Sequence, residues 1–311
     1  MVLHLVAAKK TDVGLQREQN EDACFARVVE QEQSTAGLFI VADGMGGYQA
    51  GEVASRVAVE TISKTLEPLL GPASNQPTVR LKKKRRRVQE AQETQEAQEA
   101  HADATTEEAQ AEAEAVPRES DAETRQLDEA LFLDHYASRL RNAIEDSNKA
   151  IIQYGQEHTE ASGLGSTVTT ALVIGNQAYI ANVGDSRTYL LRDGKLTRIT
   201  HDHSLVERLV QAGQIDAEDV YDHPHRNLVY RSLGAGKADV DVDVFTEPLQ
   251  DGDSLLLCSD GLWEMVRDPQ LEQILTEFAD PAEACEILIQ RANENGGEDN
   301  ITAVLVRCAE G

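Results

Sequence analysis

Acidic residues recur where apolar, strand-like runs begin or end, which is where carboxylates from distant parts of a chain can meet. They are Asp43 after residues 38–42, Asp185 after 178–183, Asp260 after 255–258, Asp299 before 301–306, and Glu21-Asp22 before 23–29. Carboxylates gathered in one place repel one another unless cations neutralise them. Because these ligands are all oxygens and no Cys or His ligand spacing is present, we predict a site for two Mg²⁺ or Mn²⁺ ions.

Asp43 is the most informative of these positions because glycines surround it, in Val41-Ala42-Asp43-Gly44-Met45-Gly46-Gly47. A glycine carbonyl such as that of Gly44 can approach a cation closely and act as a further oxygen ligand. Asp-Gly is also a common turn pair, so each position taken by itself is more often only a turn. The recurrence of the pattern favours the cation site.

A pair of divalent cations can hold a phosphate group and generate a nucleophilic hydroxide from water near neutral pH. A fixed guanidinium beside such a site would bind the phosphate through two parallel hydrogen bonds. Arg17, four residues before Glu21, is the candidate for this role. A surface ion pair is the alternative for Arg17.

The elements that must position these residues follow from apolar runs and helical spacing. Strands are predicted at residues 2–8, 23–29, 38–42, 168–174, 178–183, 188–191, 239–245, 254–258 and 301–306. Helices are predicted at 52–70, 127–157, 204–213, 269–278 and 281–293, with a polar loop at 214–227 and a tight hairpin turn at Asp193-Gly194. Helix-rich and strand-rich blocks alternate too slowly for a βαβ repeat, so we predict an α+β domain whose sheets pack together under outer helices.

Residues 72–125 differ in composition from the rest of the chain. Residues 80–87 are almost all Lys and Arg, and Glu, Gln, Ala and Thr dominate the segment that follows. Such a segment cannot bury a core. We predict a single domain, 1–311, interrupted by a charged low-complexity insertion at 72–125 that is disordered or loosely helical. Docking of this insertion on an anionic membrane or an acidic partner is the functional alternative.

Composition excludes several classes of protein. The 311 residues carry a formal net charge of −26, which argues against nucleic acid as the main partner. The four cysteines are scattered and form no CxxC pair, so a zinc site is not expected. We expect all four to be reduced thiols in a cytoplasmic protein. No apolar run approaches the roughly 18 residues of a membrane span. We predict a cytoplasmic monomer.

Eight collinear motifs resemble those of the metal-dependent Ser/Thr protein phosphatases of type 2C, in the bacterial branch. The resemblance covers residues 2–70 and 127–306, which leaves out the insertion. The motifs are Arg17-x-x-Asn20-Glu21-Asp22, Asp43-Gly44-Met45-Gly46-Gly47, Gly165-Ser166-Thr167, Asn182-Val183-Gly184-Asp185-Ser186-Arg187, Thr200-His201-Asp202-His203-Ser204, Arg231-Ser232-Leu233-Gly234, Ser259-Asp260-Gly261-Leu262-Trp263 and Glu298-Asp299-Asn300-Ile301-Thr302.

The resemblance implies a four-layer αββα sandwich, two antiparallel sheets flanked by helices, with the metals at one end. It also implies phosphoserine and phosphothreonine in proteins as substrates, a Ser/Thr kinase as the opposing enzyme, and a mobile flap at residues 204–227. The implied metal ligands are Asp43 bridging two cations with the Gly44 carbonyl, Asp260 and Asp299 on one cation, Glu21 and Asp22 supporting the other, and Asp185 near a third, weaker cation.

One departure concerns the general acid, because animal members of the family carry a histidine where this chain has Met45. A thioether cannot donate a proton, so the acid must be a metal-bound water or another group. His201 and His203 are candidates, with structural hydrogen bonding under the flap as the alternative. The predicted mechanism is direct attack of a metal-bridging hydroxide on phosphorus. The rival functions are a non-catalytic phosphoprotein-binding scaffold and a phosphatase acting on an anti-sigma-factor antagonist.

Overall fold

The computed structural model describes residues 3–31, 34–46, 50–71, 119–158, 163–235 and 238–310, with the backbone alone for 31, 34, 119–134 and 310. Residues 1–75 and 131–311 form one compact unit, and residues 76–130 form a second. Residues 72–118 of the predicted insertion lie outside the described residues. Its last residues begin the helix α3 (Glu119–Glu157).

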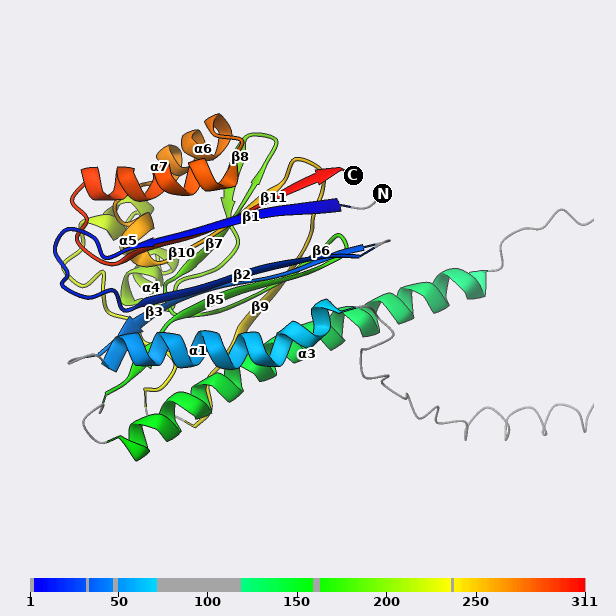
Figure 1. Ribbon diagram of the computed structural model, residues 1–311, viewed down its shortest axis with the longest axis horizontal. Coiled ribbons are helices and arrows are strands. Elements are labelled where there is room, and N and C mark those ends of the chain that lie inside the picture. The colour runs from blue at the N-terminus through cyan, green and yellow to red at the C-terminus, as the bar shows by residue number, and fades with distance from the viewer. Residues whose placement is uncertain are drawn as a thin grey trace, which may run out of the picture. The chain divides into compact units, whose positions relative to one another are not determined.

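The strands form two antiparallel sheets (Figure 1). The first sheet has the order β1 (Leu3–Asp12), β11 (Ile301–Glu310), β10 (Ser254–Cys258), β7 (Arg187–Arg192) and β8 (Lys195–Arg198). The second has the order β2 (Asp22–Gln31), β3 (Ser34–Met45), β5 (Val168–Ile174), β6 (Gln177–Val183) and β9 (Asp243–Pro248), with β4 (Gly165–Ser166) paired to β3. The predicted antiparallel pairing of the two early strands is confirmed as β2 with β3.

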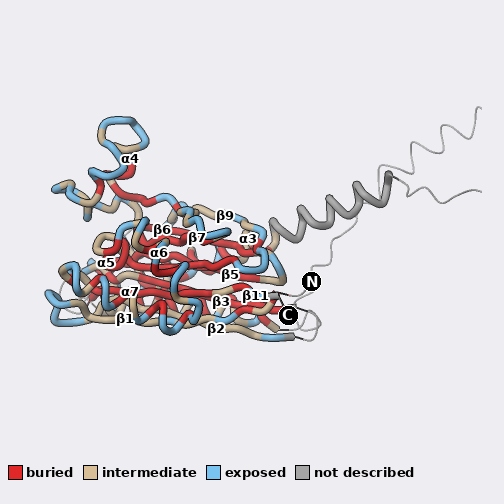
Figure 2. The backbone as a smooth tube through the Cα atoms, turned by 90° about the horizontal axis from the view of Figure 1, so that it is seen from above, coloured by how far each residue is buried: buried red, intermediate tan, exposed pale blue. Residues whose placement is uncertain are grey.

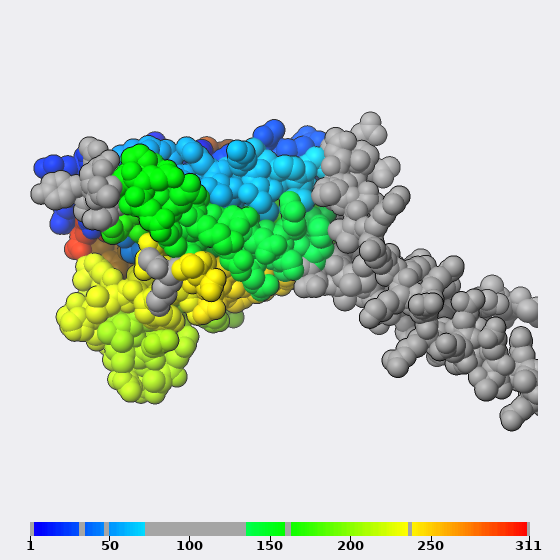
Figure 3. All heavy atoms as spheres, turned by 90° about the horizontal axis from the view of Figure 1, so that it is seen from below, coloured from blue at the N-terminus to red at the C-terminus, as the bar shows by residue number. Residues whose placement is uncertain are grey.

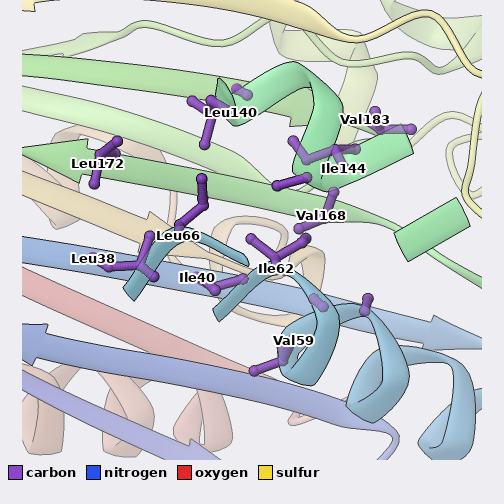
Figure 4. Close-up of a cluster of buried hydrophobic side chains, with 14 of the residues drawn as sticks. Leu38, Ile40, Val59, Ile62, Leu66, Leu140, Ile144, Val168, Leu172 and Val183 are labelled. Carbon is purple, nitrogen blue, oxygen red and sulfur yellow. The ribbon is translucent and has the colours of Figure 1, made fainter. Parts of the chain in front are cut away.

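Alternation along β3 shows why the sheets stack and helices cover them. Leu38 and Ile40 point to one face and pack with α1 (Ala50–Leu66) and α3 (Figure 4). Phe39 and Val41 point to the other face and pack against the first sheet. Because successive strand residues face opposite sides, one strand serves two cores. Each fully buried side chain of this size stabilises the fold by about 1.5–3 kcal/mol.

A third apolar cluster lies outside the first sheet, under α6 (Asp268–Glu277) and α7 (Pro281–Glu294). The order is therefore helices, sheet, sheet, helices, and the predicted αββα sandwich is confirmed (Figure 1). Local signals start the helices. The Asp280 side chain accepts hydrogen bonds from the N–H groups of Ala282 and Glu283, with Pro281 in the first turn.

Residues 204–226 form a lobe that projects from the sandwich (Figures 2 and 3). It contains α4 (Leu205–Gln211) and the short 3₁₀ helix η4 (Ala217–Tyr221). The predicted N-cap is confirmed, because the Ser204 side chain accepts from the Glu207 N–H. We refer to residues 204–227 as the flap, following the segment predicted from the sequence.

Several boundaries differ from prediction. The strand predicted at 239–245 is wrong over 239–242, because β9 begins at Asp243, opposite Asn182 near the end of its partner β6. Val240 and Val242 still pack on the core beyond that point, which explains the alternating pattern. The short helices η4 and α5 (Asp260–Trp263) were not predicted, since four or five residues carry little periodicity. The 3₁₀ helix η1 (Glu67–Leu70) ends the helix predicted at 52–70, and β8 is the second strand of the predicted hairpin.

The predicted hairpin at Asp193-Gly194 is confirmed. Both residues have positive φ, 52° and 74°, as a type I′ turn requires. None of the helices in the described part of the chain has the length and apolarity needed to cross a bilayer.

Candidate metal centre

The predicted acidic residues meet at one end of the sandwich, in a cleft of about 230 Å³ that we call the carboxylate cleft. Segments far apart in sequence bring them there. The lining residues are Arg17, Glu21, Asp43, Gly44, Met45, Gly46, Asp185, Asn227, Val229, Asp260 and Asp299. Of the predicted metal ligands only Asp22 does not line it.

Asp43 is fixed by its backbone. It lies within β3, paired with Asp22 on β2, and does not follow the strand as predicted. The Thr167 N–H donates to the Asp43 carbonyl at 2.8 Å, the Ser166 hydroxyl donates to the same oxygen at 2.9 Å, and the Asp43 N–H donates to Thr167 Oγ1 at 3.2 Å. This side chain therefore leaves a backbone that is held on both sides.

Glycine is the only residue type that fits at position 44, next to Asp43. A Cβ atom at this position would overlap the carbonyl oxygens of Gly51 and Glu21. The Gly44 N–H donates to the Glu21 carbonyl at 3.1 Å. The start of α1 thus packs directly on the segment that carries Glu21.

Asp260 opens α5, a helical turn that the sequence did not predict. Its neighbour Ser259 connects two carboxylate-bearing segments, because the Ser259 hydroxyl donates to Asp22 Oδ2 at 2.8 Å and accepts from the Thr302 N–H at 2.9 Å. Asp22 thus lies behind the cleft wall, hydrogen-bonded to the residue that precedes Asp260.

Arg17 lies at the rim of the cleft, with its side chain 49% exposed, and donates from Nη2 to Asp299 Oδ2 at 2.6 Å. Asn300 holds the loop that carries Arg17. Its Nδ2 donates to the carbonyls of Val13 and Gln19, both at 2.9 Å, and its Oδ1 accepts from the Glu21 N–H at 2.8 Å. The dipeptide Asp299-Asn300 therefore positions both the loop and its guanidinium.

Asp185 lies in the turn that connects β6 of the second sheet to β7 of the first sheet, and it lines the cleft. Its carbonyl accepts a hydrogen bond from Trp263 Nε1 at 3.0 Å. Trp263 in turn is stacked under the Arg187 guanidinium, which lies 3.4 Å from the ring centroid. Arg187 is buried and forms an ion pair with buried Asp202 at 2.7 Å. A buried ion pair therefore supports the indole ring that donates to the Asp185 carbonyl.

Burial and mutual repulsion disfavour the ionised carboxylates. Burial, with the charges of Asp260 and Asp299, raises the pKa of Asp22 to about 8 despite hydrogen bonds from Thr302 and Ser259. Burial, with the charge of Asp299, raises the pKa of Asp260 to about 6. The pKa values of Asp43 and Asp185 are raised well above the usual range for the same reasons, Asp260 being the first neighbour in each case.

These residues fit a cation pair. Asp22 Oδ1 and Asp260 Oδ1 are buried and have no hydrogen-bond partner among the described residues, and an unpaired buried carboxylate oxygen is costly unless a cation or proton satisfies it. The donors are carboxylates and a glycine carbonyl, which suit Mg²⁺ and Mn²⁺. No three His, Cys, Asp or Glu side chains of the described residues already converge as ligands of one ion.

Neither candidate histidine lines the cleft. His201 is exposed, with its ring 5.9 Å from that of Phe245. His203 is buried and has hydrogen bonds at both ring nitrogens. The structure therefore favours the structural alternative for His203. Met45 does line the cleft, as its motif predicted.

A larger cavity, about 1020 Å³, opens between the flap and the segment after α5. It contains none of the predicted site residues. Its arginines are engaged with acids, as in Arg226 with Glu264 at 3.1 Å and with Glu298 at 3.0 Å. We therefore place the chemistry in the smaller carboxylate cleft.

The supporting residues Ser166, Thr167, Ser259 and Asn300 belong to recognised motifs, yet the sequence assigned none of them a role. Their partners lie far along the chain, 124 residues away for Thr167 with Asp43 and 279 for Asn300 with Glu21. Asn227, the last residue of the flap, and Val229, just after it, also line the cleft and were missed. The motif resemblance was the one signal for the first four.

Comparison with known proteins agrees with this arrangement. A family model described as protein phosphatase 2C matches residues 16–295. The chain is 35% identical to the serine/threonine phosphatase stp of Listeria monocytogenes over 297 residues, covering 96% of this chain and 93% of that one.

Solved structures show the same similarity. The serine/threonine phosphatase PstP/Ppp of Mycobacterium tuberculosis aligns with a TM-score of 0.71 and 29% identity, over 98% of this chain and 99% of the other. A PstP catalytic domain in complex with two manganese ions aligns with a TM-score of 0.70 and 28% identity, over 99% of this chain and 100% of the other. The chain therefore belongs to the protein phosphatase 2C family.

Proposed function

We propose that this chain hydrolyses phosphoserine and phosphothreonine in proteins, using two Mn²⁺ or Mg²⁺ ions held in the carboxylate cleft. The observation that carries the proposal is the meeting of Glu21, Asp43, Asp260 and Asp299 with Arg17 in one cleft. The family membership and the two manganese ions of the related PstP domain support it.

The ligand assignment is part of the proposal. Asp43 and the Gly44 carbonyl would hold both ions. Asp260 and Asp299 would hold one ion, while Glu21 and Asp22 would support the other. Asp185, in the turn between β6 and β7, would hold a third and weaker cation. When bound, the cations neutralise charge on the phosphate and activate water as the nucleophile.

Arg17 binds the phosphate dianion in this proposal. Its guanidinium is half-exposed at the rim and already contacts a carboxylate at 2.6 Å. A small movement of the side chain would let it offer two parallel N–H groups to phosphate oxygens, where charge accumulates during the reaction. Met45 has no proton to give, and the two histidines lie outside the cleft, which leaves water as the proton donor to the leaving oxygen.

The test is Asp43→Asn, assayed on a phosphothreonine peptide with saturating Mn²⁺. The variant is expected to lose hydrolysis while its circular dichroism and unfolding midpoint stay close to wild type, since asparagine keeps the shape and the backbone hydrogen bonds of Asp43. Asp239→Asn, at an exposed position, is the matched control and should keep full activity. Undiminished turnover in Asp43→Asn, or in excess chelator, would refute the proposal.

We further propose that the substrates are products of a bacterial Ser/Thr kinase and that the protein acts in the cytoplasm. The bacterial Ser/Thr phosphatases among its relatives support the first statement. The four cysteines, all unpaired, are compatible with the second. Dephosphorylation of kinase-labelled proteins in an extract, compared between wild type and Asp43→Asn, would test the first directly.

A further inference from the structure

His203, outside the carboxylate cleft, holds both backbone groups of one glycine at the edge of that cleft. The His203 N–H donates to the Gly184 carbonyl at 2.9 Å, and the Gly184 N–H donates to His203 Nδ1 at 3.0 Å. The side chain of His203 is 3% exposed. Gly184 directly precedes Asp185, so one buried residue fixes the backbone that enters the Asp185 turn.

These contacts define the tautomer of the ring. Since Nδ1 accepts the Gly184 proton, a neutral ring must carry its hydrogen on Nε2. Nε2 lies 3.1 Å from Asp243 Oδ2, to which it donates. Arg231 Nη1 lies 2.9 Å from Nε2 and 2.7 Å from Asp243 Oδ1. Because Nη1 can only donate, with the hydrogen on Nε2 both nitrogens donate to the Asp243 carboxylate and not to each other. Burial lowers the pKa of His203, in agreement with a neutral ring. Arg231, Asp243 and His203 thus form a chain that ends at the Gly184 N–H.

The turn that His203 holds is also constrained by its own backbone conformation and by close packing against Thr167. Gly184 has φ +108°, and a Cβ there would lie 2.6 Å from the Cβ of Thr167, the residue that also fixes Asp43. The next carbonyl, that of Asp185, accepts from Trp263 Nε1 at 3.0 Å. The Asn182 Nδ2 also donates to the Gly184 carbonyl, at 3.1 Å. Three side chains, those of His203, Trp263 and Asn182, therefore hold the turn from which the Asp185 carboxylate enters the cleft.

We propose that His203 is a positioning residue whose neutral ring holds the Gly184-Asp185 turn so that the Asp185 carboxylate faces the carboxylate cleft. Its effect on cation binding rests on the proposed cation role of Asp185. The residue does not act as the general acid, because both ring nitrogens are engaged away from the cleft.

Two substitutions separate the two ends of the ring. In His203→Asn, the side-chain oxygen is attached to Cγ as Nδ1 is, so it can accept from the Gly184 N–H, while the contact with Asp243 is lost. In His203→Gln, the side-chain nitrogen reaches the Nε2 position and can donate to Asp243, while the acceptor for Gly184 is lost. Each variant loses one hydrogen bond, so a merely structural role predicts similar losses of stability.

Two readouts apply to both variants. The first is the Mn²⁺ concentration that gives half-maximal hydrolysis of p-nitrophenyl phosphate. We expect about a tenfold increase in His203→Gln, the effect of losing one hydrogen bond, and a value close to wild type in His203→Asn. The second is the fluorescence of Trp263, the one tryptophan of the chain, whose Nε1 donates a hydrogen bond to the Asp185 carbonyl. Its emission and its response to Mg²⁺ should match wild type in His203→Asn and differ in His203→Gln.

Equal behaviour of the two variants in both readouts would overturn the proposal. Asp185→Asn separates its failure from that of the cation assignment. If Asp185→Asn leaves the Mn²⁺ dependence unchanged, the cation role of Asp185 is wrong and the functional part of the proposal falls with it. If Asp185→Asn changes the Mn²⁺ dependence while His203→Gln does not, the proposal for His203 alone is overturned.

Discussion

Without divalent cations, the stability of this protein is expected to fall as the pH rises through the neutral range. Asp22 has a pKa of about 8 in the folded chain, chiefly because it is buried, against an ordinary value of 3.8. Between these values the folded protein holds a proton that the unfolded chain has released. The free energy of unfolding then decreases by about 1.4 kcal/mol for each pH unit and each such carboxyl group.

The magnitude follows for Asp22 alone. From pH 5 to pH 7 its contribution to the free energy of unfolding falls by about 3 kcal/mol. Asp22→Asn removes this titration, and asparagine can still accept the hydrogen bond from Ser259 that Asp22 Oδ2 accepts at 2.8 Å. The metal-free variant should therefore be more stable than metal-free wild type at pH 7, by an amount that shrinks as the pH falls toward 4.

Urea unfolding in excess chelator at pH 5, 6 and 7 measures this difference. Asp239→Asn, at an exposed position, is the control and should follow the wild-type slope. Adding Mn²⁺ at pH 7 should reverse the order, because cations stabilise the ionised carboxylates of wild type and bind the variant less well. The same pH slope in wild type and Asp22→Asn would refute the reasoning that buried carboxylates destabilise the metal-free fold.

Three further expectations concern the elements around the cleft. Arg17→Lys should raise the inhibition constant of inorganic phosphate, because lysine cannot offer two parallel N–H groups; an unchanged constant would remove Arg17 from phosphate binding. Asn300→Ala should cost about 3 kcal/mol in urea unfolding, from three lost hydrogen bonds, and should also weaken phosphate inhibition by releasing the Arg17 loop. Replacing residues 76–118 with a short Gly-Ser linker should leave the unfolding midpoint and peptide hydrolysis unchanged, because that composition cannot bury a core; a large loss of either would show that the segment belongs to the domain.

The elements that the sequence predicted best are strands whose residues are mostly apolar. The predicted bounds of β5 (168–174) and β10 (254–258) agree with the structure because both strands are buried on both faces. The strand predicted at 239–245 begins later in the structure, at Asp243. An alternating pattern indicates which residues are packed, but a strand also needs a neighbouring strand to pair with. The pairing of β9 with β6 ends at Asp243 with Asn182, and β6 itself ends at Val183.

The convergence of the acidic residues could be predicted because Asp43, Asp185 and Asp260 all lie at or near ends of buried strands, which a sandwich brings together. The interactions that hold them could not. Thr167, Ser259 and Asn300 act through hydrogen bonds to residues more than 100 positions away, and no local pattern encodes such a partner. The role of His203 was ambiguous for the same reason, since only the fold shows what each ring nitrogen contacts.

The count of bound Mn²⁺ ions is the most direct test of the central claim that distant carboxylates assemble a cation pair that performs the hydrolysis. Equilibrium dialysis against Mn²⁺, with peptide hydrolysis measured on the same samples, should give two tightly bound ions and full activity for wild type. Asp43→Asn should retain fewer than two tight ions and lose hydrolysis together with them. Two tight ions and undiminished hydrolysis in Asp43→Asn would contradict the account.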